Sequence, residues 1–346
     1  MAGTGKLFKE TQVQFRRSWR LVFLLAIAEI APSQDAARLQ LVGAGSTAPL
    51  PVYSTWFQSF EKSHPDLHLS YMPFGSDAGI KMATSGAADF GCSDAPLTDG
   101  QLAQAKLSQF STFLIAIVPV YSLPGITEPI KFSPKALAGI YLGTITRWND
   151  PAISDANPGV QLPASDIVVI HSANGRGSTF IWSDYLTKVS VEWRSRVGRG
   201  VYVKWPVGTA AEGNGNLAKM VAETPNSIGN VELAFALHTR LQVGQVQNSA
   251  GNFITADSTS MTAAAKAMPS DSRNSLTNPP GRGSYPLSSF TWILIPENMN
   301  STKREAMKEF LRWMLNEGQI SADMPGFARL PPATVEPEMR AVERIP

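Results

Sequence analysis

GAGSTAPLPVY at residues 43–53 and GCSDAPLT at residues 91–98 are the two stretches that decide how this chain folds. In the first, a loop of Gly, Ser and Thr runs directly into a helix-like segment. In the second, small residues end a strand, Asp94 follows with Ser93 beside it, and Pro96 closes the turn. We expect these loops to form two walls of one site for an oxyanion, and one wall carries a carboxylate.

A carboxylate in an anion site limits which anions can bind there. Asp94 repels an anion unless that anion has a proton to share, because two full negative charges in one site repel each other. Hydrogen phosphate carries such a proton and sulfate does not. The sequence therefore predicts a site that binds hydrogen phosphate and rejects sulfate.

The surrounding sequence alternates between strand and helix patterns. We expect strands at 39–42, 67–74 and 88–94, and helices at 52–63 and from about 79 to 85. This alternation predicts an α/β fold with parallel strands. Ligands in such sheets bind beyond the carboxyl ends of the strands, against helix N-termini, and both quoted loops lie at such positions.

The rest of the chain continues the pattern with one exceptional strand. The apolar run at 113–123 is long enough to cross between two domains, and 208–218 is expected to form a Gly-rich turn. The stretch 244–285 is rich in polar residues, Pro, Gly and Ser, and its order is left open. Further elements are expected as strands at 166–172 and 286–295 and as helices at 133–143, 304–315 and, after a Gly-rich turn, within 174–189.

The length and charge of the chain limit the classes of protein to which it can belong. The chain has 346 residues, of which 43% are hydrophobic, which is enough for two domains with separate cores. Its formal net charge is +2, but five basic residues and one acidic residue fall within residues 1–28. The remainder holds 25 basic and 27 acidic residues, so no nucleic-acid partner is indicated.

The first 28 residues have the pattern of a secretory signal. A basic segment that ends at Arg20 precedes the apolar run at 21–28, and Ala26 and Ala28 resemble a cleavage signal. That run is shorter than the roughly 20 residues of a membrane span. We therefore expect an exported, periplasmic protein whose mature part is soluble and monomeric.

The reactive side chains indicate neither a cofactor nor a metal site. The one cysteine, Cys92, is interpreted as a small buried hydrophobe. The four histidines show no metal-ligand spacing. Neither a nucleophile elbow nor a Ser/His/Asp arrangement is evident, so an enzyme such as a phosphatase is the least favoured class.

Ordered motifs along the chain resemble the PstS-type periplasmic phosphate-binding proteins of the Pst ABC transporter. GAGSTAPLPVY resembles the family's opening GAG-x-T-F-P-x-P-x-Y, and ADFGCSDAPLT resembles its DFG-x-SDAPL. IYLGTITRWNDPAI at 140–153 resembles a third landmark of the family, IYLG-x-I-x-x-W-x-D-x-A-I. The later stretches that echo the family are VKWPVG, SIGNVE, FTWILI and GFARLP.

The resemblance implies a two-domain periplasmic-binding-protein fold of type II, with the anion in the cleft between domains. One domain would comprise both chain ends, 39–115 plus 286–346, and the other the middle, 116–285. The implied function is binding of inorganic phosphate and its delivery to an ABC permease in the inner membrane. The alternative is a divergent, non-transport relative that senses phosphate or binds another oxyanion.

The resemblance also implies which residues hold the phosphate. Asp94 would accept the proton of hydrogen phosphate, and the other groups would donate hydrogen bonds to its oxygens. The implied phosphate-binding residues are Thr47, Ala48, Ser76, Asp94, Gly177 and Ser178, and Arg176 is a further candidate at a position where the family has a serine that contacts phosphate.

The second-domain loop departs from the family pattern R-x-D-G-S-G-T-T/S. The family's arginine falls on Ser172 and its aspartate on Asn174, a paired loss that leaves no buried charge without a partner. A new arginine, Arg176, stands where the family has a serine. Either Arg176 reaches the anion and replaces the lost contact, or it points outward or blocks the cleft and weakens binding. Glu212, in place of a base near the rim, would slightly oppose anion entry.

Overall fold

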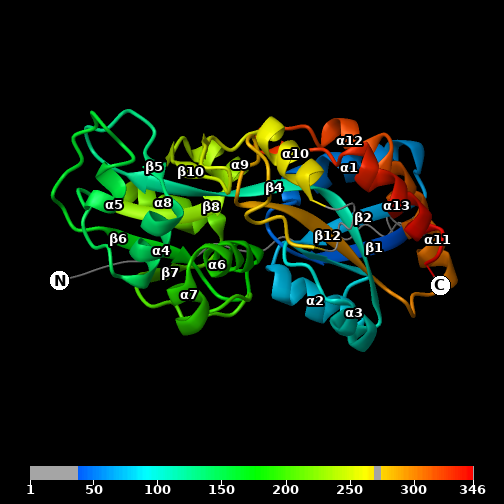
Figure 1. Cartoon of the computed structure of the whole chain (residues 1–346). Coiled ribbons are helices and arrows are strands. Elements are labelled where there is room, and N and C mark those ends of the chain that lie inside the picture. The colour runs from blue at the N-terminus through cyan, green and yellow to red at the C-terminus, as the bar shows by residue number, and fades with distance from the viewer. Residues whose placement is uncertain (1–37, 269–273, 346) are drawn as a thin grey trace, which may run out of the picture. The chain divides into compact units, whose positions relative to one another are not determined.

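A single sheet runs through the part of the chain that the computed structural model describes, residues 38–268 and 274–345 (Figure 1). Its strand order is β2-β1-β3-β12-β4-β8-β6-β7, and β13 and β9 both pair with β4 outside this path. The strands of this sheet are Leu39–Gly45 (β1), Leu67–Met72 (β2), Phe90–Ser93 (β3), Leu107–Ser122 (β4), Val168–Ser172 (β6), Thr209–Ala211 (β7), Ser227–Glu232 (β8), Gln242–Val243 (β9), Ser288–Pro296 (β12) and Phe327–Ala328 (β13).

The polar stretch 244–285 contains two strands and a helix before residues 269–273, which lie outside the described residues. It supplies two strands of a second, three-stranded sheet, whose members are Lys131–Phe132 (β5), Gln245–Gln247 (β10) and Phe253–Ile254 (β11). It also contains the helix Ser258–Ala267 (α10), which a capping box at Asp257 begins.

Twelve further helices lie among the described residues. They are Leu50–Ser63 (α1), Ser76–Ser85 (α2), Asp99–Ala105 (α3), Pro134–Leu142 (α4), Pro151–Ser154 (α5), Gly177–Val189 (α6), Val191–Arg196 (α7), Asn214–Glu223 (α8), Leu233–Thr239 (α9), Ser301–Leu315 (α11), Gly318–Ser321 (α12) and Pro332–Val342 (α13). No helix among the described residues has the length and apolar character of a membrane span.

The predicted parallel strands occur in two groups. β1 pairs in parallel with β2 and β3, and β6 pairs in parallel with β7 and β8. Between the two groups, β4 pairs antiparallel with β12 over residues 107–116 and then with β8 over residues 117–122 (Figure 1). The expected long apolar strand therefore exists, begins at Leu107 rather than at 113, and belongs to both groups.

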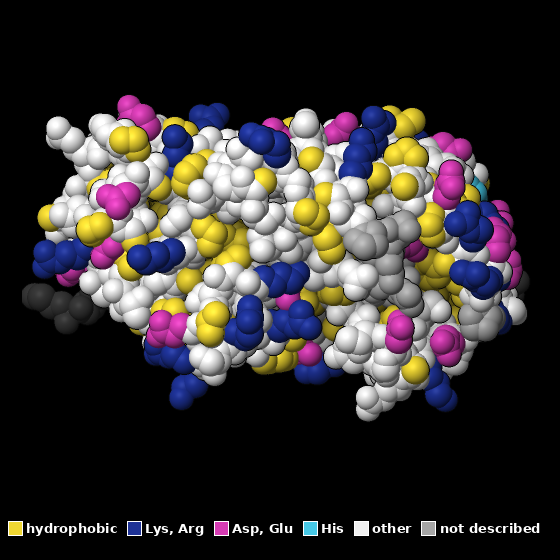
Figure 2. Space-filling view, viewed as in Figure 1, with side chains coloured by type: hydrophobic (Ala, Val, Ile, Leu, Met, Phe, Trp, Pro, Cys, Tyr) yellow, Lys and Arg dark blue, Asp and Glu magenta, His cyan; other side chains and the backbone are white. Residues whose placement is uncertain are grey.

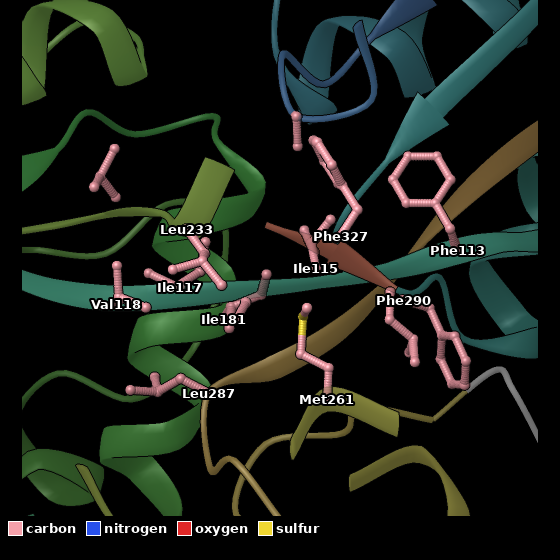
Figure 3. Close-up of a cluster of buried hydrophobic side chains, with 14 of the residues drawn as sticks. Phe113, Ile115, Ile117, Val118, Ile181, Leu233, Met261, Leu287, Phe290 and Phe327 are labelled. Atoms are coloured by element: carbon pink, nitrogen blue, oxygen red, sulfur yellow. The ribbon is translucent and has the colours of Figure 1, made fainter. Parts of the chain in front are cut away.

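The core is built along β4. Side chains from its two parts pack against different neighbours, and Figure 3 shows Phe113 and Ile115 near Phe327 and Phe290. Farther along the strand, Ile117 and Val118 lie near Leu233 and Ile181. The side chains that Figure 3 labels around β4 are at most 3% exposed: Ile181, Leu233, Met261, Leu287, Phe290 and Phe327. Burial on both faces explains why the strand is a continuous apolar run rather than an alternating one.

Two segments differ from the sequence-based expectation. The GSDAG stretch, expected as a loop before a helix at 79, instead enters α2 directly at Ser76. Gly75 has a φ of 106°, which an L side chain rarely adopts, so glycine permits this abrupt entry. The expected turn at 208–218 contains β7 and the first half of α8, which begins at Asn214.

Asp184, a fully buried carboxylate, ties α6 to the segment around residue 275. Its Oδ1 lies 2.8 Å from Arg199 Nη1, and its Oδ2 lies 3.0 Å from Lys188 Nζ. Ser275 donates to Oδ2 at 2.6 Å, and the Thr277 hydroxyl donates to the same oxygen. Burial acts to raise the pKa of Asp184, but the Lys188 charge and these hydrogen bonds outweigh it and leave that pKa lowered.

We expect Asp184→Ala to lower the free energy of unfolding at neutral pH by about 3 kcal/mol. This value is at the low end of the cost of breaking a buried ion pair, because the side chains of Arg199 and Lys188 are partly exposed to solvent. A lowered folded-state pKa stabilises the fold above the unfolded pKa, and that stability is lost as pH falls through the folded pKa. Urea unfolding should therefore show the difference between the variant and the unsubstituted protein narrowing in acid.

The exposed Asp155→Ala serves as the matched control and should change the free energy of unfolding by less than about 0.5 kcal/mol. A drop after Asp184→Ala that is no larger than this control would contradict a stabilising role for the buried cluster.

Candidate functional site

Three helix N-termini converge on one small cavity. Gly75 precedes α2, Arg176 precedes α6 and Gly213 precedes α8. Each of these helices has at least ten residues, and a helix N-terminus presents free N–H groups and a partial positive charge. The cavity has a volume of about 10 Å³ and is lined by Ser46, Thr47, Gly75, Ser172, Arg176, Gly177, Ser178, Gly213, Asn214 and Glu232.

The first wall is organised around Asp94, which is fully buried. Its Oδ2 accepts a hydrogen bond from the Ser46 hydroxyl, and its backbone N–H donates to Ser76 Oγ at 3.1 Å. Within the described residues, Oδ1 has no hydrogen-bond partner. Burial raises the pKa of Asp94 to about 6, and the hydrogen bond from Ser46 acts against this rise. An unpartnered carboxylate oxygen of this kind is an acceptor for a proton on a ligand.

The second wall touches the first at Gly177. A Cβ built on Gly177 would lie 2.5 Å from Asp94 Cβ and 2.7 Å from Ser76 Oγ. Only a residue without a side chain fits between these two groups. A cavity of about 10 Å³ has room for about one water molecule at most. We therefore expect the two walls to move apart at this contact when a tetrahedral oxyanion enters.

Ser172, the last residue of β6, and Asn174, in the loop between β6 and α6, form hydrogen bonds to neutral groups. The Ser178 hydroxyl donates to Ser172 Oγ at 2.9 Å, and the Ser172 N–H donates to Asn230 Oδ1 at 3.3 Å. Asn174 exchanges two hydrogen bonds with the backbone of Val203, at 3.2 and 3.1 Å. Ser172 and Asn174 therefore hold the loop through separate hydroxyl and amide contacts.

Arg176 lies at the rim of the cavity and spans its two walls. Its Nη1 donates to the carbonyl of Phe74 at 3.2 Å, and its Nη2 lies 2.7 Å from Glu212 Oε2. The guanidinium side chain is 20% exposed. Glu212 thus pairs with Arg176 and offsets its charge.

Glu232 and Asn214 are functional candidates that the sequence analysis did not identify. Glu232 ends β8, is 3% exposed and lines the cavity. Asn214 Nδ2 donates to Glu232 Oε2 and, at 3.0 Å, to Thr47 Oγ1. A glutamate at the end of the buried strand SIGNVE was the available signal, because such a position at a strand's carboxyl end faces the ligand edge of a parallel sheet.

The predicted residues divide into two sets. Thr47, Arg176, Gly177 and Ser178 line the cavity. Ala48, Ser76 and Asp94 do not line it. Instead, Ala48 N–H donates to Ser46 Oγ at 3.2 Å, and Asp94 and Ser76 stand directly behind Gly177. Ser46 is therefore a member of this wall that the sequence analysis did not single out.

The face of the molecule shown in Figure 2 carries charges of both signs. On the face shown in Figure 2, Lys and Arg side chains are interspersed with Asp and Glu. This agrees with the formal net charge of +2 over 346 residues. An anion would thus be attracted by the local helix N-termini and hydrogen-bond donors rather than by the net charge of the protein.

Comparison with known proteins agrees with this geometry. The model of the PBP superfamily domain matches residues 31–317. The phosphate-binding protein PstS of Xylella fastidiosa is 36% identical over 313 residues, covering 88% of this chain and 85% of that protein. The phosphate-binding protein PstS of Pasteurella multocida is 36% identical over 302 residues, covering 86% and 88%.

Solved structures give the same fold at lower sequence identity. A putative phosphate ABC transporter substrate-binding protein from Clostridium perfringens, solved with bound phosphate, aligns with a TM-score of 0.63 at 19% identity and covers 85% of this chain and all of that one. The high-affinity periplasmic phosphate-binding protein PfluDING, also bound with phosphate, aligns with a TM-score of 0.71 at 18% identity, covering 88% and 93%.

Proposed function

The chain belongs to the PBP superfamily and, within it, to the PstS phosphate-binding proteins, and on this premise we propose that it binds hydrogen phosphate for import by an ABC transporter. The observation that carries the proposal is Asp94, a buried carboxylate beside the helix N-termini with one oxygen unpartnered among the described residues. Donors around the cavity would hold the phosphate oxygens, and Asp94 would accept the proton that sulfate lacks.

The proposal assigns the phosphate contacts to seven residues. Asp94 accepts the ligand's proton, and the hydroxyls of Thr47, Ser76 and Ser178 and the N–H groups of Ala48 and Gly177 donate. Arg176 contributes a charge at the rim. The groups contact one another in this structure, so the cleft would open for the ligand to enter and close again so that they surround the phosphate.

The role is binding and delivery without chemistry of its own. The related proteins are named as binding proteins of a transporter or as phosphate-binding proteins, which supports a non-enzymatic role. We propose that the protein acts as a monomer in the periplasm and delivers phosphate to membrane permease subunits. The signal segment at residues 1–28, which would direct export, lies outside the described residues.

The division into two domains, 39–115 plus 286–346 and 116–285, is also proposed. The change of partner along β4 supports it, because pairing with β12 ends at Ala116 and pairing with β8 begins at Ile117. α10, although it falls in the middle segment, packs against β12 and β13. The chain around α10 would then bridge the two domains.

Calorimetric titration of the ligand-stripped protein with phosphate, repeated in excess sulfate, tests the proposed function. We expect tight binding of phosphate that excess sulfate does not reduce. Absence of a phosphate signal, or equal competition by sulfate, would refute the proposal.

We expect Arg176→Ala to lower phosphate affinity about tenfold. The variant removes a guanidinium that lines the cavity and bonds the Phe74 carbonyl across the cleft, and a hydrogen bond to a charged group contributes about 1.5–3 kcal/mol. Calorimetry at low ionic strength measures the change. Glu212→Gln serves as the counterpart: it frees Arg176 from its ion pair and should not weaken binding. Unchanged affinity in Arg176→Ala would mean that this arginine takes no part in holding the anion.

A further inference from the structure

The cavity contains a carboxyl group that the proposed phosphate contacts do not use. Glu232 lines it at the end of β8 and is 3% exposed. The nearby cation, Arg176, forms its ion pair with the exposed Glu212 rather than with Glu232. A second carboxylate in a cavity that receives an anion would be strongly unfavourable in its charged form.

The hydrogen bonds around Glu232 fix the orientation of its carboxyl group. Asn214, the first residue of α8, donates from Nδ2 both to Glu232 Oε2 and to Thr47 Oγ1. One carboxyl oxygen is therefore held as an acceptor next to a residue of the opposite wall. The other oxygen of the same group can then carry a proton and act as a donor.

The charges that face Glu232 come from several elements. Asp94 follows β3, Arg176 precedes α6, and Glu212 precedes α8, whose Asn214 contacts Glu232 directly. Burial is the main cause that raises the pKa of Glu232 well above its ordinary value; the Asp94 charge adds to the rise and the Arg176 charge opposes it. Geometry and electrostatics therefore both favour the protonated form.

We propose that Glu232 is part of the anion site as a neutral carboxylic acid and donates its O–H to the bound phosphate. The inference rests on the proposed function and adds a donor to it. The complex then holds two protons, one on the phosphate and shared with Asp94, the other on Glu232, and no covalent bond forms or breaks. The family's arginine falls on Ser172, which lies on β6, and β6 pairs with β8. Glu232, at the end of β8, would therefore supply a neutral donor on the wall that lacks this arginine.

Phosphate affinity measured by calorimetry from neutral to strongly alkaline pH tests this role. Above the second pKa of inorganic phosphate the ligand stays dianionic, so any further loss of affinity reports on the protein. We expect affinity to fall about tenfold per pH unit once Glu232 loses its proton. In the same range, titrations in buffers of different ionisation enthalpy should show uptake of about one proton per phosphate bound.

Glu232→Gln keeps a donor of the same shape that cannot ionise. Its alkaline fall in affinity and its proton uptake should disappear, because its side chain has no proton to lose in this range. Glu223→Gln makes the same chemical change at a side chain of α8 that is 66% exposed, and it should retain the original pH dependence.

Several outcomes would overturn the inference while the proposed function stands. These are an affinity of the unsubstituted protein that does not fall in alkali, the absence of proton uptake in that protein, or an alkaline fall in affinity that persists unchanged in Glu232→Gln. The proton-uptake measurement on the unsubstituted protein requires no variant to fold. If that protein bound no phosphate at any pH, the proposed function would fail and this inference with it.

Discussion

Gly177→Ala is expected to weaken phosphate binding about tenfold to hundredfold. The new methyl group would lie 2.5 Å from Asp94 Cβ and 2.7 Å from Ser76 Oγ, distances that force either the α6 terminus or the Asp94 loop to shift. Overpacking of this kind costs about 1–3 kcal/mol. The cost falls on the closed cleft, in which the two walls meet, and affinity depends on how favourably the cleft closes around the ligand. Calorimetric titration with phosphate measures the effect.

Gly177→Ala should leave helix α6 and the rest of the fold intact. Gly177 is the first residue of α6, and alanine has the higher helix propensity. Gly215→Ala provides the matched control, because that glycine lies in the first turn of α8 and a Cβ there would meet no atom within 4 Å. Equal phosphate affinity in the two variants would mean that the contact between the walls does not limit closure.

Local sequence patterns predicted most of the scaffold because these patterns act over short distances. The strand that ends at Ser93 and the helices α1 and α11 follow from apolar spacing. Helix entry at Ser76 was placed too late, because the decisive feature is the positive φ of Gly75, and residue type alone does not specify that angle. Four of the candidate phosphate-binding residues, which came from the family resemblance and not from apolar spacing, line the cavity, and their contacts to phosphate stay a prediction.

The parts of the site that sequence could not predict depend on long-range placement. Whether Arg176 reaches the anion or points away is decided by Glu212 and by the Phe74 carbonyl, which lies 102 positions from Arg176 in the sequence. In the structure the Arg176 guanidinium lies at the rim of the cavity, bonded to the Phe74 carbonyl and to the Glu212 carboxylate. Glu232 was overlooked for a related reason, because the end of an apolar strand does not reveal which loop its carboxyl group will meet.

Asp94→Asn is expected to lower phosphate affinity about 10- to 150-fold and to remove most of the preference over sulfate. The substitution places an N–H₂ group where the unpartnered carboxylate oxygen stands, so the proton of hydrogen phosphate loses its acceptor, and a charge-assisted hydrogen bond contributes about 1.5–3 kcal/mol. Sulfate oxygens, in contrast, gain a donor and lose a repelling charge. Paired titrations with the two anions measure the ratio, and an unchanged ratio would rule out Asp94 as the selecting residue.

Stability measurements separate this effect from damage to the fold. The folded-state pKa of Asp94 is raised from 3.8 to about 6, so the folded protein holds the proton more tightly than the unfolded chain. The free energy of unfolding therefore decreases as pH rises between these two values and stays lower above them. Asp94→Asn removes this penalty and should unfold at a higher urea concentration at neutral pH, with a gain on the order of 3 kcal/mol. The exposed Asp155→Asn should show neither change. A variant that is more stable and less selective would indicate that the buried charge is retained for anion discrimination at the expense of stability.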